Sequence, residues 1–441
     1  MKSLPLVVVL VVLTAMLGVG VAPLSAETGG HSQLETVDAE PSDGTQPYAT
    51  QPHDMRSLQS VEAGENGVLQ TLTLPTETIE RSDLRRQHVD LGPAAGFDTG
   101  VTTDRLATRT IEAELDAADS DAERLARIDD EFTELETRII ELEDHQQQTI
   151  RAFSDGTVDP QELLETVATI HLRAGTYRER MSMLEASAEA IDDDALSDGR
   201  LERIESDLEM LESPVRAHAA SVLRGEQPAN RIMIETGNNE LTLAAIEDGS
   251  YIREVNRQGL RGNRTDILST DQLDEIWQQQ YPTVWDRKDE WAYGPNSVSV
   301  TKMKDPGGEL QIFINGVDEQ TFIEHQRMPL GGLDTGESTN KTQDGLNVTV
   351  DQTYAGGPLR VTVTDAETEE PVAATVTIGQ DNQESQSVGT VEQNGVVWAV
   401  SPRGPSTITV LGEGTAAAFV DIDPPSPESA TSSQQSGASS E

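Results

Sequence analysis

Residues 153–164, with the sequence FSDGTVDPQELL, contain the side chains that the second half of an EF-hand calcium loop requires. Asp155, Gly156 and Asp159 fall at loop positions five, six and nine, and Glu162 falls at position twelve. The first half does not match, because position one is Arg151 and position three is Phe153. Neither side chain offers an oxygen to calcium, and a working loop needs several oxygens from this half.

The same stretch fits a turn followed by the start of a helix. Asp159 is suited to be the N-cap, Pro160 the first helical residue and Glu162 the third, while Gly156 can reverse the chain. We therefore interpret the stretch as a turn between two helices. The second acidic turn, residues 192–205, fails as a calcium loop in the same way, since Leu196 occupies a ligand position.

Histidines and nucleophiles show no spacing typical of catalysis. The chain has no cysteine, and it lacks His-x-His, His-Glu-x-x-His, Gly-x-Ser-x-Gly, a phosphate-binding loop and a dinucleotide fingerprint. We interpret His171, next to a heptad position, and His218, at one, as packed helix residues. Carboxylates are so frequent that no single pair indicates a glycosidase. The sequence therefore predicts no catalytic residues, no metal and no cofactor. The seven histidines are His31, His53, His88, His145, His171, His218 and His325.

Aromatic residues make up only 4% of the chain, yet several gather in one short stretch. They are Trp277, Tyr281, Trp285, Trp291 and Tyr293. Aromatic side chains contribute strongly to core burial, so the simpler interpretation is that they pack a helix on its sheet. The alternative is a ligand platform, in which aromatic faces and indole N–H groups bind a glycan or peptide of a partner.

The 441-residue chain carries a formal net charge of −47, and most of its 31 basic residues are arginine. Such an acidic, lysine-poor surface is typical of a halophilic protein, because at ~1 M salt the Debye length of ~3 Å screens the self-repulsion. The same charge repels nucleic acids and anionic membrane surfaces, so we expect no nucleic acid as partner. Lysine occurs only at Lys2, Lys288, Lys302, Lys304 and Lys341.

The first 26 residues have the pattern of a secretory signal. Lys2 precedes an apolar run from Leu4 to Val21, and the small residues Ser25 and Ala26 follow. We expect a signal peptide over residues 1–26, or an uncleaved membrane anchor. The protein would then be exported, either extracellular or attached to the outer face of the cell membrane, and would touch the membrane only through this segment. Glycosylation sequons lie at Asn263, Asn340 and Asn347.

Residues 27–100 are expected to be a flexible linker with one short strand near residues 68–74, and residues 101–226 are helical in pattern. "SDAE" at residues 120–123 is a capping box, and Pro214 is expected to kink the last segment. Short polar turns between amphipathic segments predict an antiparallel, coiled-coil-like α-helical bundle. The heptad residues are Leu125, Ile128, Phe132, Leu135, Ile139 and Leu142, and then Leu163, Val167, Ile170, Ala174, Tyr177, Met181, Leu184, Ala188 and Ile191.

From Arg231 onward the apolar residues alternate with a period of two. Residues 229–335 are expected to form a small α+β domain, an antiparallel sheet with one helix across it. Asn315-Gly316 is a hairpin signal within it. Residues 344–423 contain short strands separated by Asp, Asn, Gly and Pro turns, which predicts a C-terminal β-sandwich. The composition of residues 424–441 predicts a disordered tail.

Residues 103–423 resemble a domain-of-unknown-function family of uncharacterised exported haloarchaeal proteins. The resemblance rests on "FSDGTVDPQELLETVATIHLRAG", "SPVRAHAASVLRGE" and "TYAGGPLRVTVTDAETEEPVAATVTIG" followed by "GVVWAVSPRG". The last pair is also similar to carboxypeptidase-regulatory or transthyretin-like domains. The resemblance implies an exported archaeal surface protein and transfers no catalytic residues.

We therefore expect a non-enzymatic cell-surface protein that acts in high salt as a spacer or scaffold with binding modules for a protein or glycan. An exposed tryptophan cluster would favour this function. One alternative is an accessory or inhibitory subunit of a surface peptidase, which co-purification with a protease would reveal. The other is a carboxylate-dependent hydrolase, which requires a cleft with two facing carboxylates.

Overall fold

The computed structural model describes residues 61–63, 70–74, 78–192, 196–261, 268–288, 290–293, 298–305, 308–331, 333, 335–336, 338–380, 385–391 and 394–423. The expected signal segment, the sequon at Asn263 and the expected C-terminal tail lie outside these residues. All described residues belong to one compact unit.

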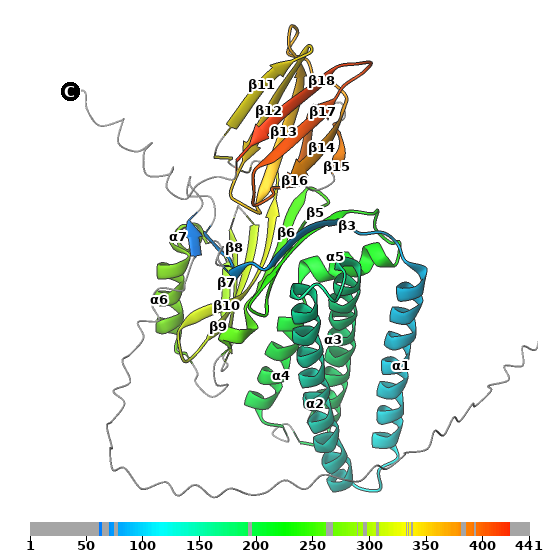
Figure 1. Cartoon of the computed structure of the whole chain (residues 1–441). Coiled ribbons are helices and arrows are strands. Elements are labelled where there is room, and N and C mark those ends of the chain that lie inside the picture. The colour runs from blue at the N-terminus through cyan, green and yellow to red at the C-terminus, as the bar shows by residue number, and fades with distance from the viewer. Residues whose placement is uncertain are drawn as a thin grey trace, which may run out of the picture. The chain divides into compact units, whose positions relative to one another are not determined.

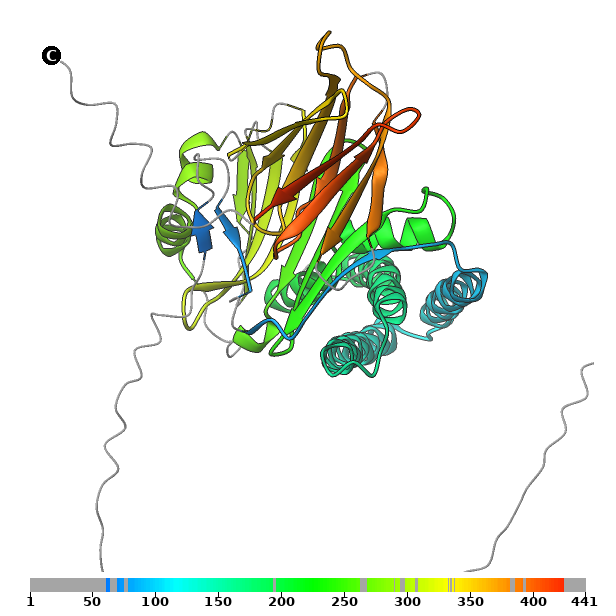
Figure 2. The ribbon, with the colours of Figure 1, turned by 45° about the horizontal axis from the view of Figure 1, so that its top comes forward.

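An eight-stranded antiparallel sheet occupies the middle of the described chain (Figures 1 and 2). Its strand order is β3-β4-β5-β6-β10-β9-β8-β7. Left-handed Asn238 and Asn239, with φ of 52° and 63°, make the tight turn between β4 and β5. The hairpin expected at Asn315-Gly316 is confirmed, since β9 and β10 pair directly. The strands are β3 (Arg81–Arg86), β4 (Arg231–Gly237), β5 (Glu240–Glu247), β6 (Ser250–Asn256), β7 (Glu290–Tyr293), β8 (Val298–Asp305), β9 (Gly308–Asn315) and β10 (Gln320–Pro329).

Long helices formed by the amphipathic segments lie on one face of this sheet (Figure 1). They are α1 (Leu91–Asp116), α2 (Asp121–Ser154), α3 (Pro160–Glu189), α4 (Asp198–Leu211) and α5 (Pro214–Leu223). Most heptad residues of α2 and α3 join apolar residues of α1 and α4 in one buried cluster, whereas Leu163 and Val167 belong to the cluster at the sheet. Ser120 caps α2 as expected, accepting from the amide of Glu123, whereas the Glu123 carboxylate accepts from Asp119 rather than from Ser120.

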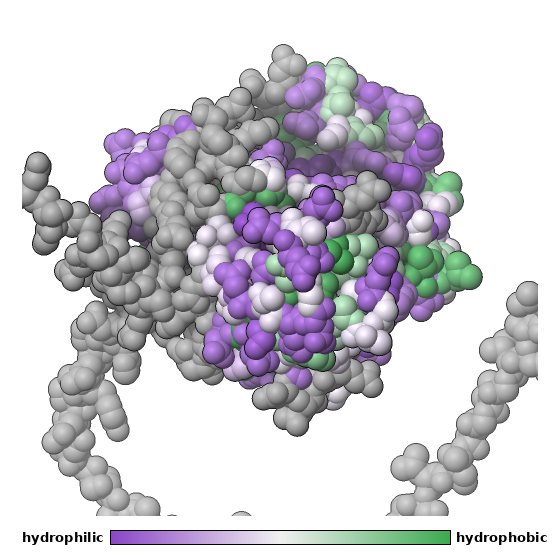
Figure 3. Space-filling view, turned by 90° about the horizontal axis from the view of Figure 1, so that it is seen from above, coloured by the Kyte–Doolittle hydropathy of each residue, from purple (hydrophilic) through white to green (hydrophobic). Residues whose placement is uncertain are grey.

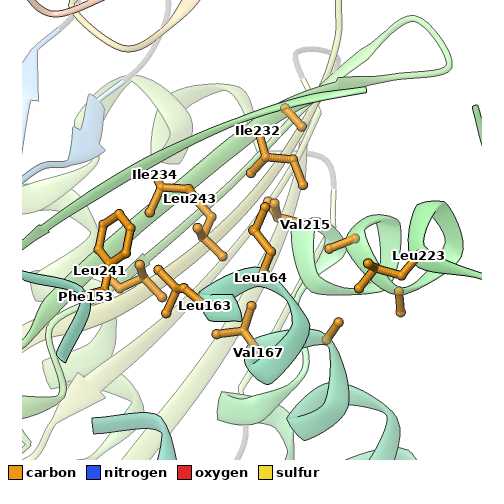
Figure 4. Packing of buried hydrophobic residues seen from close by; sticks show 14 of the residues in the cluster. Phe153, Leu163, Leu164, Val167, Val215, Leu223, Ile232, Ile234, Leu241 and Leu243 are labelled. Carbon is orange, nitrogen blue, oxygen red and sulfur yellow. The ribbon is translucent and has the colours of Figure 1, made fainter. Parts of the chain in front are cut away.

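A second cluster joins the helices to the sheet (Figure 4). From the helices, this cluster contains Leu163, Leu164 and Val167 of α3 and Val215 and Leu223 of α5. From the sheet, it contains Ile232 and Ile234 of β4 and Leu241 and Leu243 of β5. At ~1.5–3 kcal/mol for each fully buried aliphatic side chain, this cluster is a major stabilising contact between helices and sheet. The helices therefore share a hydrophobic core with strands that follow them in the chain.

The opposite face of the sheet is covered by α6 (Thr270–Gln280), α7 (Pro282–Arg287) and a small sheet of β1 (Val61–Ala63) and β2 (Gln70–Leu72). Leu310, Ile312 and Ile314 of β9 pack against α6, while Phe313 between them packs on Met210 of α4. This alternation follows from the period of two along a strand. Both faces of the central strands are consequently buried, which explains their nearly continuous apolar runs.

A buried ion pair fixes β2 to the sheet. Arg253 Nη1 lies 2.9 Å from Glu324 Oε1, and both side chains are almost completely buried. Leu72 donates its amide to Glu324 Oε2 at 2.8 Å, and its carbonyl accepts from Arg253 Nη2 at 2.6 Å. Tyr281 donates to the same carboxylate at 2.8 Å. The two buried charges are thus paired and hydrogen-bonded, which offsets the free-energy cost of removing them from water.

The C-terminal part is a β-sandwich of two four-stranded sheets, β11-β12-β13-β16 and β15-β14-β17-β18. Its buried core includes Val361, Val376 and Val410, which alternate with outward-facing residues along their strands. Glu235 of β4, which has no exposed surface, accepts from Arg403 Nε of the sandwich at 2.7 Å. The strands are β11 (Ser338–Gln343), β12 (Leu346–Gln352), β13 (Pro358–Asp365), β14 (Ala374–Gln380), β15 (Gln386–Val391), β16 (Val396–Val400), β17 (Ser406–Leu411) and β18 (Ala417–Ile422). Hydrophilic residues cover most of the coloured surface in the view of Figure 3.

Four expectations from the sequence need correction. The expected linker to residue 100 instead contains β3, an edge strand of the large sheet, and the start of α1 at Leu91. That sheet is therefore not confined to residues 229–335. Pro214 does not kink a helix but begins a new one, because Ser213 caps α5 by accepting from Arg216. The sandwich begins before residue 344, since β11 pairs with β12 along its whole length.

Candidate functional site

The turn at residues 155–159 serves as a helix start, as the sequence predicts. Asp159 Oδ1 accepts from the amides of Gln161 at 2.8 Å and Glu162 at 3.0 Å. Gly156 adopts a φ of 74°, the left-handed conformation that favours glycine. The Asp159 carboxylate, which a calcium loop would use as a ligand, therefore caps the N-terminus of α3. Within the described residues, no group of three or more acidic or histidine side chains is arranged to hold a metal ion.

Two of the five aromatic residues considered as a ligand platform belong to the hydrophobic core. Trp277 and Tyr281 are both 0% exposed and pack beside Trp285 on β9, so the core-packing interpretation is correct for them. The cation of Lys288 lies 3.1 Å from the centre of the Trp285 ring. Trp291 and Tyr293 are on β7, and their side chains lie outside the described residues.

The two described sequons face each other across one strand pair of the sandwich. Asn340 of β11 lies opposite Thr349 of β12, and Asn347 lies opposite Thr342. Thr342 Oγ1 donates to Asn347 Oδ1 at 3.2 Å, and Thr349 Oγ1 donates in the same way to Asn340. The asparagine of each sequon thus contacts the threonine of the other.

A pocket of about 550 Å³ lies between the helices and the sheet. This volume falls within the roughly 300–1,000 Å³ range that is usual for small-molecule sites. Its lining comes from α3, from the α4–α5 junction, and from β9 and β10. The lining residues are His171, Glu209, Glu212, Ser213, Pro214, Ala217, Glu309, Leu310, Gln311, His325, Gln326 and Arg327.

A buried ion pair lies beside the pocket wall. Arg216 and Glu254 are both 0% exposed, and Arg216 Nε lies 2.8 Å from Glu254 Oε2. Ser213, in the wall, donates its hydroxyl to the same carboxylate at 2.6 Å. Burial alone would raise the pKa of the Glu254 carboxyl, but the charge and hydrogen bonds of Arg216 hold that pKa below its usual range. The pair is therefore ionised, and it binds Ser213 as part of a rigid wall.

Two imidazole rings line the pocket from opposite sides of this junction. His171 extends from α3 and His325 from β10. Burial and then the nearby Arg216 guanidinium lower the pKa of His171 to about 4, so its ring is neutral at pH 7. His171 Nδ1 is buried and has no hydrogen-bond partner among the described residues. The His325 ring packs edge-on against Phe313, with centroids 5.3 Å apart.

Sequence reasoning placed His171 in helix packing and gave no role to His325, and it missed the pocket entirely. The only local signal was a polar residue, His171, beside the apolar positions of α3. The other lining residues come from strands that the sequence does not connect to α3. A pocket of this kind becomes visible only when the helix–sheet packing is known.

A family model described as a domain of unknown function, DUF7096, matches residues 1–228, which is more than half of the chain. The chain belongs to the DUF7096 family. In this DUF7096 protein, residues 232–334 match a family of unknown function, DUF7094, and residues 337–419 match an archaeal fibronectin-III type-like domain. No curated protein and no solved structure matches the chain.

These matches confirm the expected membership of an archaeal family of unknown function. They differ from the expectation for the C-terminal part, because the matching model is fibronectin-III type-like rather than carboxypeptidase-regulatory or transthyretin-like. Alternating short strands indicate a sandwich without separating one sandwich family from another. Within the described residues, no helix is both long and apolar enough to span a membrane.

The pocket of this DUF7096 protein is assembled from two of the matched segments. His171 and residues 209–217 belong to the segment that matches DUF7096. Residues 309–311 and 325–327 belong to the segment that matches DUF7094. Neither segment by itself encloses the pocket, so its integrity depends on the core that α3 and α5 share with β4 and β5.

Proposed function

We propose that the protein is a non-enzymatic binding protein of the cell surface, adapted to high salt, whose binding site is the pocket between the helices and the sheet. The observation that carries this proposal is the pocket itself, with its suitable volume and its buried, partly unpartnered polar lining. The helices and the sandwich act as the scaffold that holds and displays it. The apolar run from Leu4 to Val21 supports export, and the net charge of −47 supports a saline environment.

The polar chemistry around the pocket favours binding over catalysis. The Ser213 hydroxyl donates to Glu254, a carboxylate that is already paired with Arg216, and it accepts from the Arg216 amide as a helix cap. An activated nucleophile would instead donate to a general base such as a histidine. The Ser213 hydroxyl thus serves the wall of the pocket.

Ligand screening by thermal shift, on the full chain in molar KCl, tests this function. We expect some small molecules to raise the melting temperature of the wild type, because a ligand bound only by the folded state must stabilise it. Ala217→Phe places a ring in the pocket and should abolish these shifts. Ala107→Phe, on the exposed face of α1, is the matched control and should keep them.

Two results would contradict the proposed function. The first is a screen in which no compound stabilises the wild type. The second is a set of shifts that survives Ala217→Phe unchanged, which would place the binding elsewhere. Cell-surface labelling of the intact organism tests the location independently, and labelling only after lysis would contradict export.

A further inference from the structure

The outer face of the sheet β11-β12-β13-β16 is poor in charge over three of its strands. Residues directly opposite each other in antiparallel strands point to the same face, so two rows of side chains cross β11, β12 and β13. The rows face outward, because Val348 and Val363 at the alternate positions belong to the sandwich core. None of the six residues in the rows is charged, although 25% of the whole chain is, and in the next row Asp351 and Arg360 neutralise each other at 2.9 Å. The two rows are Thr342, Asn347 and Thr364, and Asn340, Thr349 and Thr362.

Both described sequons lie on these two rows. One consists of Asn340 and Thr342 on β11, and the other of Asn347 and Thr349 on β12. Elsewhere, surface carboxylates keep this acidic chain hydrated and soluble. On this face an attached oligosaccharide can supply the same hydration, because its hydroxyl groups can exchange hydrogen bonds with the threonine hydroxyls and asparagine amides beneath it. The chemistry of the face therefore suits a surface that is covered by sugar.

The two asparagines differ in accessibility. β11 is the edge strand of its sheet, so Asn340 has a neighbouring strand on one side only, and it is exposed. Its Oδ1 accepts from Thr349 Oγ1 at 2.5 Å, whereas its Nδ2, the atom that bonds to the sugar in a glycosylated asparagine, has no hydrogen bond to another described residue. Asn347 is half-buried on the inner strand β12, between Thr342 and Thr364. A sugar on Asn347 would have to displace these neighbours, whereas a sugar on Asn340 extends into solvent.

We propose that Asn340 carries an N-linked oligosaccharide and that Asn347 does not. The inference takes from the proposed function only the location at the cell surface, and it does not involve the pocket. In the transfer, Asn340 Nδ2 bonds to the anomeric carbon of an oligosaccharide that is carried on a lipid phosphate. The bond from that carbon to the phosphate oxygen breaks, the amide loses one proton, and the lipid phosphate leaves. A separate transferase acts on the folded chain, where β11 can open locally because it pairs with one strand, whereas β12 is held by two.

Peptide mass spectrometry tests the site on the full chain, purified from the organism that produces it. Trypsin cleaves after Arg327, Lys341 and Arg360, so Asn340 and Asn347 fall on separate peptides, residues 328–341 and residues 342–360. We expect the first peptide to carry an added oligosaccharide mass and the second to have the mass of its unmodified sequence.

Substitutions within the sequon identify the linkage. Asn340→Gln removes the acceptor and Thr342→Ala removes the hydroxyl that the sequon requires, so each should abolish the added mass. Thr342→Ser keeps a hydroxyl at the same position and should retain the added mass. Asn347→Gln is the matched control on the neighbouring strand, and it should also retain the added mass on residues 328–341.

Three results would overturn the proposal. The first is an unmodified peptide 328–341 from the wild type. The second is an added mass that survives Asn340→Gln, which would assign the sugar to a hydroxyl group of the same peptide. The third is equal modification of residues 342–360, which would show that exposure does not select the site. The ligand screen and the surface labelling test the proposed function separately, so a failure of either one is distinguishable from a failure of this inference.

Discussion

Two buried ion pairs of this protein use neighbouring residues of one strand. Arg253 and Glu254 are neighbours on β6, so their side chains point to opposite faces of the sheet. Arg253 pairs with Glu324 beside β2, and Glu254 pairs with Arg216 of α5 beside the pocket. Removing one partner of such a pair leaves an unpaired buried charge, which typically costs about 3–5 kcal/mol. The two pairs thus specify how the helices and β2 dock on the sheet.

The lowered pKa of His171 predicts a specific dependence of stability on pH. Between pH 6.5 and about 4 the unfolded chain binds a proton that the folded chain excludes, so the free energy of unfolding should fall as the pH falls through this window. The shift corresponds to about 3 kcal/mol over the whole window. His171→Gln removes this contribution. Urea unfolding in molar KCl should show the wild type losing stability relative to the variant on acidification.

About one pH unit or more above 6.5, the His171 ring is neutral in both the folded and the unfolded chain. The difference in stability between wild type and His171→Gln should therefore be constant there, which provides an internal control. A difference that stays constant down to pH 4 would show that His171 is accessible to protons in the folded protein.

Capping and turn chemistry operate at the scale of single elements, where the sequence is most informative. Asp159 starts α3 and Ser213 starts α5, in each case by accepting amide hydrogen bonds of the first turn. The α4–α5 break shows a limit of this reasoning. Apolar residues continue at helical spacing across Pro214, so the pattern predicts one kinked helix, whereas the cap at Ser213 divides it in two.

The turn before α3 should not respond to calcium. Calcium or a chelator, at constant ionic strength, should leave the melting temperature of the full chain unchanged, since a ligand of the folded state would raise it. Asp159→Ala should lower stability by about 1 kcal/mol through loss of the cap. Asp155→Ala removes an exposed carboxylate of the same turn and should cost less. A calcium-dependent rise in melting temperature that Asp155→Ala abolishes would instead identify a metal site.

The sandwich strand β14 offers a second test at this scale. Val376 has no exposed surface, so Val376→Asp buries a carboxylate without a partner and should destabilise the sandwich by several kcal/mol, about 3 or more. Thr375→Asp changes the exposed neighbour on the same strand and should have little effect. Thermal unfolding in molar KCl, followed by separate probes of helix and strand, measures both. Equal shifts of the two signals would show that sandwich and helices unfold as one unit.

At the scale of the whole molecule, three matched segments are joined by shared cores. α3 and α5 pack on β4 and β5, and Met233 on the opposite side of β4 packs with Tyr354 and Val400 of the sandwich. Tyr251 of β6 donates to the carbonyl of Gly356 at 2.8 Å across the same contact. The central sheet therefore connects the helices on one face to the sandwich on the other.

A net charge of −47 predicts that the full chain loses structure when it is diluted from molar salt into dilute buffer. In ~10 mM salt the Debye length grows to ~30 Å, so carboxylates across the molecule repel one another. Circular dichroism during dilution at constant pH measures the effect. Cooperative folding with unchanged stability in dilute buffer would contradict the halophilic interpretation.

The sequence alone determined features that depend on neighbouring residues. The helix start at Asp159, the hairpin at Asn315-Gly316 and the alternation of the sandwich strands were all predicted correctly, because caps, turns and strand periods act over a few residues. The burial of Trp277 and Tyr281 was the preferred interpretation for the same kind of reason.

Contacts between segments that are far apart in the sequence were decided only by the tertiary structure. β3 lies in a segment expected to be a linker, yet it pairs with β4, which is far away in the sequence. No local pattern in residues 81–86 predicts β4 as the partner strand. The pocket is a stronger case, since His171 and His325 belong to segments that match different families. Their meeting depends on the packing of α3 and α5 against the sheet, a contact that burial of apolar surface stabilises without regard to separation in sequence.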